Sequence, residues 1–153
     1  MNFRTIDIEK DKDMIIKFRK DTYSISHGTE EGFDEIAYLN RMAERVSKFP
    51  KGQLIIEEKN KPIGQIGLFI REYCGRQIGY VNLYYLIPKY RNRGLGRELV
   101  DYGEKFFRKL NLKEYHLRVD VANKRAISFY TKVGMNKLKE EDNGQRLVMR
   151  KKL

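Results

Sequence analysis

Cysteine and histidine are scarce in this chain. Its 153 residues include one cysteine, Cys74, and two histidines, His27 and His116. A single cysteine cannot form an internal disulfide, so the sequence predicts a protein of a reducing compartment, the cytoplasm. No histidine lies near Cys74 in the sequence to activate its thiol. We therefore expect neither a cysteine nucleophile nor a metal site.

Long apolar runs are absent as well. No window approaches the ~20 consecutive apolar residues that a membrane-spanning helix needs. The first residues, Met1-Asn2-Phe3-Arg4, lack the apolar core of a signal peptide. There is no internal repeat, linker or low-complexity segment. A length of 153 residues with 41% hydrophobic residues predicts one domain, residues 1–153, with a sizeable core.

Basic residues clearly outnumber acidic ones, and the formal net charge is +11. Such a charge favours either a nucleic-acid partner or a pocket for a small molecule rich in phosphate. The lysines and arginines are spread along the whole chain, and no nucleic-acid-binding motif is present. Binding of nucleic acid is therefore the less favoured interpretation.

Residues 82–99 contain the most informative pattern. Residues 83–87 are apolar or aromatic, which predicts a mostly buried strand. Pro88 ends the strand because it has no N–H to donate. A short basic turn follows, with Lys89, Arg91 and Arg93, and Gly94-Leu95-Gly96 then opens an amphipathic helix. The first N–H groups of a helix lack internal partners and carry partial positive charge, so this arrangement predicts a phosphate or pyrophosphate site.

The two common phosphate motifs are missing from this segment. Walker A requires Lys and Ser or Thr after its last glycine, whereas Gly96 is followed by Arg97 and Glu98. The dinucleotide motif requires a third glycine, and the residue at that place is Leu99. What remains is R-x-x-G-x-G, formed by Arg91, Gly94 and Gly96.

Hydrophobic periodicity predicts the order β α α β β β α β α β β. The first helix is predicted to begin at an N-cap, Asp11, and the central helix at about Arg93. This order predicts an α/β sandwich, with helices on a mixed sheet. The expected strands are 3–6, 53–58, 62–71, 78–87, 115–121, 135–139 and 146–150, and the expected helices are 11–25, 33–48, 93–110 and 123–132.

A second motif spans residues 123–134, with the pattern N-x-x-A-x-x-x-Y-x-x-x-G. Asn123 is suited to cap the helix. Ala126 and Tyr130 are four residues apart and share one helix face. Both motifs, and the order of elements from end to end, resemble the GNAT superfamily of N-acetyltransferases. Met135 departs from the family pattern, in which phenylalanine is commoner.

The resemblance implies a mixed, mostly antiparallel sheet of about seven strands flanked by about four helices. It also implies an enzyme that transfers the acetyl group of acetyl-CoA directly to a primary amine. Tyr84 and Leu86 would offer backbone groups to the pantetheine arm and the acetyl carbonyl. Asn123 would contact the pantetheine, and Tyr130 would act as general acid at the sulfur. The residues expected around the phosphates are Arg91, Asn92, Arg93, Gly94, Leu95 and Gly96, with Lys124 or Arg125 at the 3′-phosphate.

The sequence departs from the family pattern at the position of the expected general base. Many members carry a glutamate early in the fourth strand, and Tyr80 stands at that place. A phenol with a pKa of ~10 is a poor base at neutral pH. Asp120 and Glu72 are possible substitutes, and the sequence does not choose between them. The alternative is a protein that binds acetyl-CoA as a sensor or interaction module.

The acceptor is predicted to be cationic. In the resembling fold, two segments flank the acceptor mouth, and both are acidic here: residues 30–35 and 140–142. A cleft lined by one sign of charge concentrates ligands of the opposite sign. The competing explanation is that these carboxylates only stabilise a helix start and a hairpin. The sequence leaves open whether the acceptor is a small molecule or a peptide, and whether the protein forms a homodimer.

Overall fold

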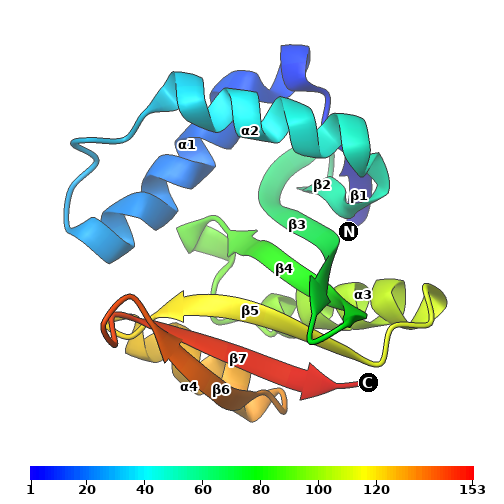
Figure 1. The fold of residues 1–153 in the computed structure, drawn as a ribbon. Coiled ribbons are helices and arrows are strands. Elements are labelled where there is room, and N and C mark those ends of the chain that lie inside the picture. Colours follow the sequence, from blue (N-terminus) through cyan, green and yellow to red (C-terminus); the bar gives the residue numbers. More distant parts are fainter. The chain divides into compact units, whose positions relative to one another are not determined.

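The structure, a computed structural model, describes residues 1–153 (Figure 1). Four helices and seven strands make up the fold, and two short 3₁₀ turns at Pro50–Gly52 and Pro88–Tyr90 link some of them. The elements are, in order, β1 (Asn2–Thr5), α1 (Ile8–His27), α2 (Glu35–Lys48), β2 (Gln53–Glu58), β3 (Lys61–Tyr73), β4 (Arg76–Leu86), α3 (Leu95–Lys109), β5 (Glu114–Asp120), α4 (Lys124–Lys132), β6 (Asn136–Glu141) and β7 (Arg146–Lys152).

The strands form one sheet in the order β1-β2-β3-β4-β5-β7-β6. Its pairs β1–β2, β2–β3, β5–β7 and β6–β7 are antiparallel, and β4–β5 is parallel. The predicted α/β class, with a mixed and mostly antiparallel sheet, is confirmed. None of the helices has the length and apolar character that crossing a membrane requires.

The chain divides into two compact units. The first unit combines Met1–Gly67 with Leu83–Arg93, and the second combines Leu68–Asn82 with Gly94–Leu153. The chain therefore passes between the units within β3, within β4 and at the Arg93–Gly94 bond. The expectation of a single domain over residues 1–153 stays a prediction.

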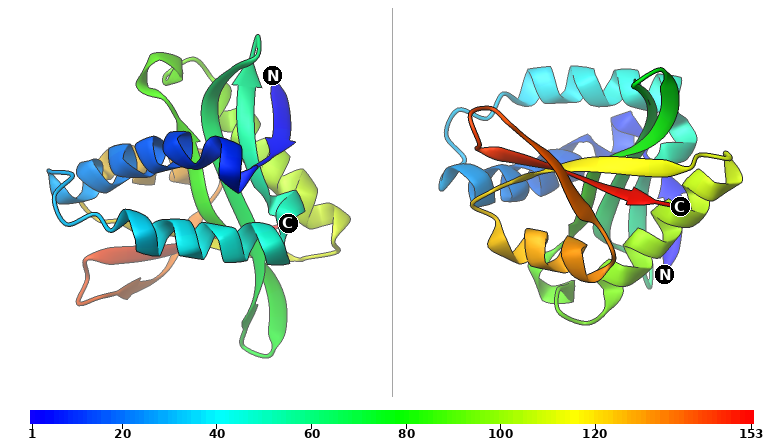
Figure 2. Two further views of the ribbon diagram at one scale, coloured as in Figure 1. Left: turned by 90° about the horizontal axis from the view of Figure 1, so that it is seen from above. Right: turned by 60° about the horizontal axis from the view of Figure 1, so that its bottom comes forward.

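In the first unit, α1 and α2 run side by side across the strands (Figure 2, left). Their apolar faces meet β2 in a buried cluster of Ile6, Ile15, Tyr38, Met42 and Ile55. Ile15 and Ile55 are completely buried. The amphipathic periodicity of both helices thus positions the core of this unit.

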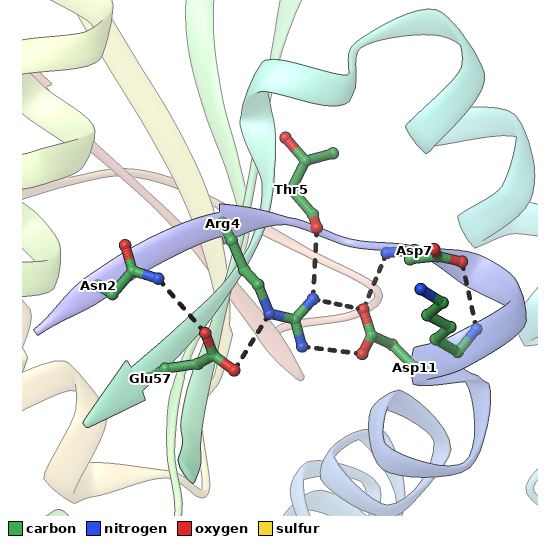
Figure 3. A network of polar contacts seen from close by, with 7 residues as sticks. Asn2, Arg4, Thr5, Asp7, Asp11 and Glu57 are labelled. Atoms are coloured by element: carbon green, nitrogen blue, oxygen red, sulfur yellow. Dashed lines mark hydrogen bonds and ion pairs between the residues drawn. The ribbon is translucent and has the colours of Figure 1, made fainter. Parts of the chain in front are cut away.

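The start of α1 differs from the prediction. The N-cap is Asp7, whose side chain accepts a hydrogen bond from the Lys10 N–H, and the helix begins at Ile8. Asp11, predicted as the cap, lies one turn inside the helix and forms a bidentate pair with Arg4, with Nη–Oδ distances of 2.8 and 2.9 Å (Figure 3). Arg4 lies on β1, and hydrophobic periodicity alone does not reveal that this residue meets Asp11. The Arg4 guanidinium holds the pKa of Asp11 below its usual value.

In the second unit, α3 and α4 lie on one face of the strands (Figure 2, right). The Phe107 ring of α3 packs 5.4 Å from that of Tyr115 on β5. A Cβ at Gly79 of β4 would lie 2.6 Å from the Phe107 ring, so only glycine fits there. Since side chains alternate along a strand, Tyr80 points to the face opposite α3.

Candidate active site

The start of α3 leaves its backbone N–H groups accessible. Gly94 is the N-cap, with a φ of 80°, and no side chain caps the helix. A Cβ at Gly94 would meet nothing within 4 Å. Asn92, two residues earlier, also has a left-handed φ, of 61°. The helix starts at Leu95 rather than at the predicted Arg93, because these two left-handed residues interrupt helical geometry. The turn therefore presents free donors at the positive end of α3.

Gly96 brings this turn against α4. A Cβ at Gly96 would lie 3.2 Å from the Phe129 ring, so the glycine allows a close approach of the two helices. Asn123 caps α4 as predicted, and its side-chain oxygen accepts the Ala126 N–H at 3.1 Å. The amide N–H₂ of Asn123 is then left as a donor for a ligand.

Tyr130 lies on α4, one turn after Ala126 and next to Phe129. Its side chain is half-buried, and its hydroxyl has no hydrogen-bond partner within the protein. Burial raises the pKa of Tyr130 to about 12. The phenol is therefore protonated at neutral pH and available as a hydrogen-bond or proton donor.

Asn82 is a residue that sequence reasoning missed. The parallel pairing of β4 with β5 runs from Gly79 to Val81 and ends there. Asn82 follows directly, and its buried Nδ2 has no hydrogen-bond partner. A buried donor without a partner costs about 1–3 kcal/mol, which a ligand oxygen would relieve. The signal available in the sequence was a polar residue beside an apolar strand segment.

The side chain of Arg91 is committed to α1. Its Nε donates to the Leu86 carbonyl oxygen at 2.8 Å, and its Nη2 donates to Asp21 Oδ2 at 2.7 Å. The Tyr85 hydroxyl donates to the same Asp21 oxygen at 2.6 Å. Burial and the Asp21 carboxylate raise the pKa of Tyr85. Arg91 therefore holds the basic turn to α1, and its predicted contact with the pyrophosphate stays a prediction.

The other predicted cofactor residues are placed as follows. Leu86 is buried, at the end of β4, and Tyr84 is half-buried. The Arg93 guanidinium is exposed and lies over the Tyr90 ring, 5.4 Å from its centre. Arg125 is exposed in the first turn of α4. Lys124 is also exposed there. The roles of all of them toward a cofactor stay predictions.

The candidates for the general base have different surroundings. Tyr80 is 6% exposed. Burial raises its pKa, while Arg118 and Arg71 oppose that shift, so the phenol stays protonated at neutral pH. Asp120 accepts the Ala122 N–H at 2.8 Å and stabilises the turn before α4. No hydrogen bond joins Tyr80 to Asp120. Glu72 is exposed on β3.

A buried pair of ionisable groups lies on β5, beside Tyr80. His116 is opposite Tyr80 in the strand register, and its Nε2 lies 2.7 Å from Glu114 Oε2. Arg76 donates to the other Glu114 oxygen at 2.5 Å. Burial lowers the pKa of His116, so the imidazole is neutral at pH 7. The sequence analysis did not identify this pairing of His116 with Glu114.

The two acidic segments largely have local partners. Asp34 caps α2 by accepting the Ala37 N–H. The ion pairs are Glu35–Lys20 at 2.6 Å, Glu140–Lys137 at 2.8 Å and Glu141–Arg118 at 2.6 Å. A cationic acceptor stays a prediction, but these pairs weaken the observation from which it came.

Comparisons with known proteins bear on the family and the fold of this chain. A model of the acetyltransferase (GNAT) family matches residues 13–135. An uncharacterised N-acetyltransferase of Methanocaldococcus jannaschii is 25% identical over 128 residues, and the match covers 78% of this chain and 57% of that protein. The chain thus spans little more than half the length of that relative.

Two solved structures share the fold. One is the PaiA N-acetyltransferase of Thermoplasma acidophilum in complex with coenzyme A, with a TM-score of 0.78, 21% identity, and coverage of 99% of this chain and 98% of that one. The other is Naa20 of Chaetomium thermophilum in complex with a bisubstrate analogue, with a TM-score of 0.79, 18% identity, and coverage of 100% and 87%.

Proposed function

Since the chain belongs to the acetyltransferase (GNAT) family, we propose that it transfers the acetyl group of acetyl-CoA directly to a primary amine of a small molecule or peptide. The observation that carries the proposal is the start of α3. An uncapped helix N-terminus, opened by Gly94, packs through Gly96 against the helix that bears Tyr130. Such an arrangement suits a phosphate group bound next to a proton donor.

The residues present fit the co-substrate. The free N–H groups at the start of α3 suit a pyrophosphate, and the open space at Gly94 allows it to approach the backbone. The partnerless Asn82 Nδ2 and the free amide of Asn123 supply donors for the amide and carbonyl oxygens of a pantetheine arm. Arg93 and Arg125 add positive charge on the surface for the phosphates.

Acetyl-CoA, when bound, supplies the activated acetyl group. The acceptor amine must lose a proton, and the departing thiolate must be stabilised. Tyr130 donates from its hydroxyl, which is protonated at neutral pH because burial raises its pKa. Donors on β4 stabilise negative charge at the acetyl carbonyl oxygen. Tyr80, which also stays protonated, serves as a donor or positioning group rather than as the base.

A second candidate is a protein that binds acetyl-CoA without efficient catalysis. The observation that favours it is the buried, protonated Tyr80 at the place where many family members carry a glutamate. The retained Tyr130 and Asn123 favour the enzyme. Both candidates predict binding of acetyl-CoA, and only the enzyme predicts turnover.

Two measurements test the proposal. Calorimetry should show binding of acetyl-CoA, and a free-thiol assay over a panel of primary amines should show amine-dependent release of CoA. Binding without release for any amine would support the sensor, and absence of binding would refute both.

The cytoplasmic location and a homodimer stay predictions, testable by fractionation and light scattering.

A further inference from the structure

The second unit carries an arginine-rich sheet face on the side opposite α3. Tyr80 belongs to this face, because the neighbouring Gly79 packs against Phe107 of α3. Phe69 of β3 packs 5.1 Å from the Tyr80 ring. Neither α3 nor α4 covers this side. We call the set Arg71, Tyr80 and Arg118 the arginine–tyrosine cluster.

Two guanidinium groups share one aromatic ring in this cluster. The Arg71 Cζ lies 4.6 Å from the centre of the Tyr80 ring, and the Arg118 Cζ lies 5.8 Å from it. Arg118 also donates through Nε to Glu141 at 2.6 Å. Arg71 has no ion-pair partner. Both guanidinium groups thus lie near one ring, and the carboxylate of Glu141 neutralises only one of them.

The surroundings add further positive charge. Lys139 of β6 lies over the Tyr73 ring on the same face, and Arg150 of β7 lies opposite His116 in the register. The carboxylates of this face already have partners: Glu114 pairs with Arg76, Glu141 pairs with Arg118 and Lys139, and Asp120 accepts the Ala122 N–H. Cations therefore outnumber carboxylates on a surface that also holds Tyr80, at the place where the family carries its catalytic glutamate.

We propose that the arginine–tyrosine cluster recognises a carboxylate on the acceptor, so that the preferred substrate is an amine that also bears a carboxylate. The proposal rests on the proposed acetyl transfer and runs opposite to the cationic acceptor predicted from the acidic segments. Arg118 uses only Nε on Glu141, so its two terminal nitrogens can donate to a ligand. Arg71, which has no carboxylate partner, supplies a second guanidinium for the same group.

The test compares acceptors that differ only in their carboxylate. One arm uses free α-amino acids against their carboxamides, and a second uses peptide amides with an acidic residue against the same peptides with Gln or Asn. In wild type, kcat/KM should be higher for the acceptor with the carboxylate in at least one arm. The arm that shows this preference tells whether a free amino acid or an acidic peptide supplies the carboxylate. In Arg71→Gln and Arg118→Gln, that preference should fall by about tenfold or more, as expected for losing a charge-assisted hydrogen bond.

Arg108→Gln is the matched control, since Arg108 is an exposed arginine on α3, away from the cluster. It should keep the wild-type preference. Thermal unfolding of each variant shows whether it is folded, and Arg71→Lys, which keeps the charge, should retain part of the preference. A wild-type preference for diamines would overturn the proposal. Equal losses of kcat/KM for both acceptors of each pair in the cluster variants would overturn it as well.

A binding experiment separates this inference from the proposed function. The CoA-loaded protein is titrated calorimetrically with an N-acetylated amino acid and with its carboxamide. Tighter binding of the acid, lost in Arg71→Gln, supports the cluster even if no amine is turned over. Equal binding of acid and carboxamide refutes it. Failure of the protein to bind acetyl-CoA at all refutes the proposed function instead.

Discussion

Gly94 and Gly75 form a matched pair of glycines for testing the phosphate site. Both have left-handed backbones, with φ values of 80° and 79°, and a Cβ at either would meet nothing within 4 Å. Aspartate at either position pays a similar backbone cost of about 1–2 kcal/mol. Only Gly94→Asp adds a negative charge beside the start of α3. We expect calorimetry to show loss of acetyl-CoA binding in Gly94→Asp and near-normal binding in Gly75→Asp. Equal affinities in the two folded variants would contradict the site.

Tyr130→Phe tests the general acid. The substitution keeps the ring and removes a hydroxyl that makes no hydrogen bond within the protein, so stability should change little. General acid catalysis contributes about 10²–10⁴-fold, and kcat should fall by that range while acetyl-CoA affinity persists. Because burial raises the pKa of Tyr130 to about 12, its proton is lost only as the pH approaches that value, and activity below pH 10 should show no loss from this group. Full turnover in the Phe variant, under conditions where chemistry limits the rate, would make Tyr130 a packing residue.

At the scale of elements, the start of α1 depends on Asp11. Its carboxylate is 6% exposed, and Arg4 holds its pKa below the usual value. A carboxyl with a lowered pKa stabilises the folded state above its unfolded pKa, and that contribution is lost as the pH falls through the folded pKa. Asp11→Asn should therefore cost about 1–3 kcal/mol in urea unfolding at pH 7 and progressively less toward strongly acidic pH. Asp13→Asn, at an exposed position of the same helix, should change little at either pH. A penalty for Asp11→Asn that stays constant with pH would contradict the ion pair.

Asp21 connects α1 to the basic turn. Its Oδ2 accepts from both Arg91 and Tyr85, so Asp21→Asn weakens the attachment of the turn without touching the proposed cofactor residues at Gly94–Gly96. We expect the acetyl-CoA dissociation constant to rise by about three- to tenfold, the range of a lost charged hydrogen bond shared between two donors. In a double-mutant cycle with Arg91→Gln, the two losses should not add. Fully additive losses would show that Arg91 acts on the cofactor independently of Asp21.

For the whole molecule, the net charge of +11 keeps nucleic acid as the rival partner. Charge alone gives non-specific duplex binding with a dissociation constant of about 10⁻⁴–10⁻⁶ M at physiological salt. Fluorescence anisotropy with a random DNA duplex should show binding no tighter than that, with a steep salt dependence. Acetyl-CoA should still bind in the presence of excess duplex. Tight duplex binding that persists at high salt would favour the nucleic-acid interpretation.

Local patterns in the sequence determined much of this protein. The order of helices and strands, the cap at Asn123, and the two family motifs each depend on residues close together in the chain. Hydrophobic periodicity, Pro88 and left-handed glycines act over a few bonds, so they can be read without knowing the fold. The class of the fold and the family followed from them.

Only the tertiary structure decided which distant side chains meet. Asp11 of α1 is not the predicted cap: Asp7 caps the helix, and Asp11 pairs with Arg4 of β1. Arg91 is held by Asp21, 70 positions away. Arg71 and Arg118 share Tyr80 because β3, β4 and β5 bring them to one sheet face. Contacts between ionised groups depend on separation in space and on burial, and the sequence alone contains neither.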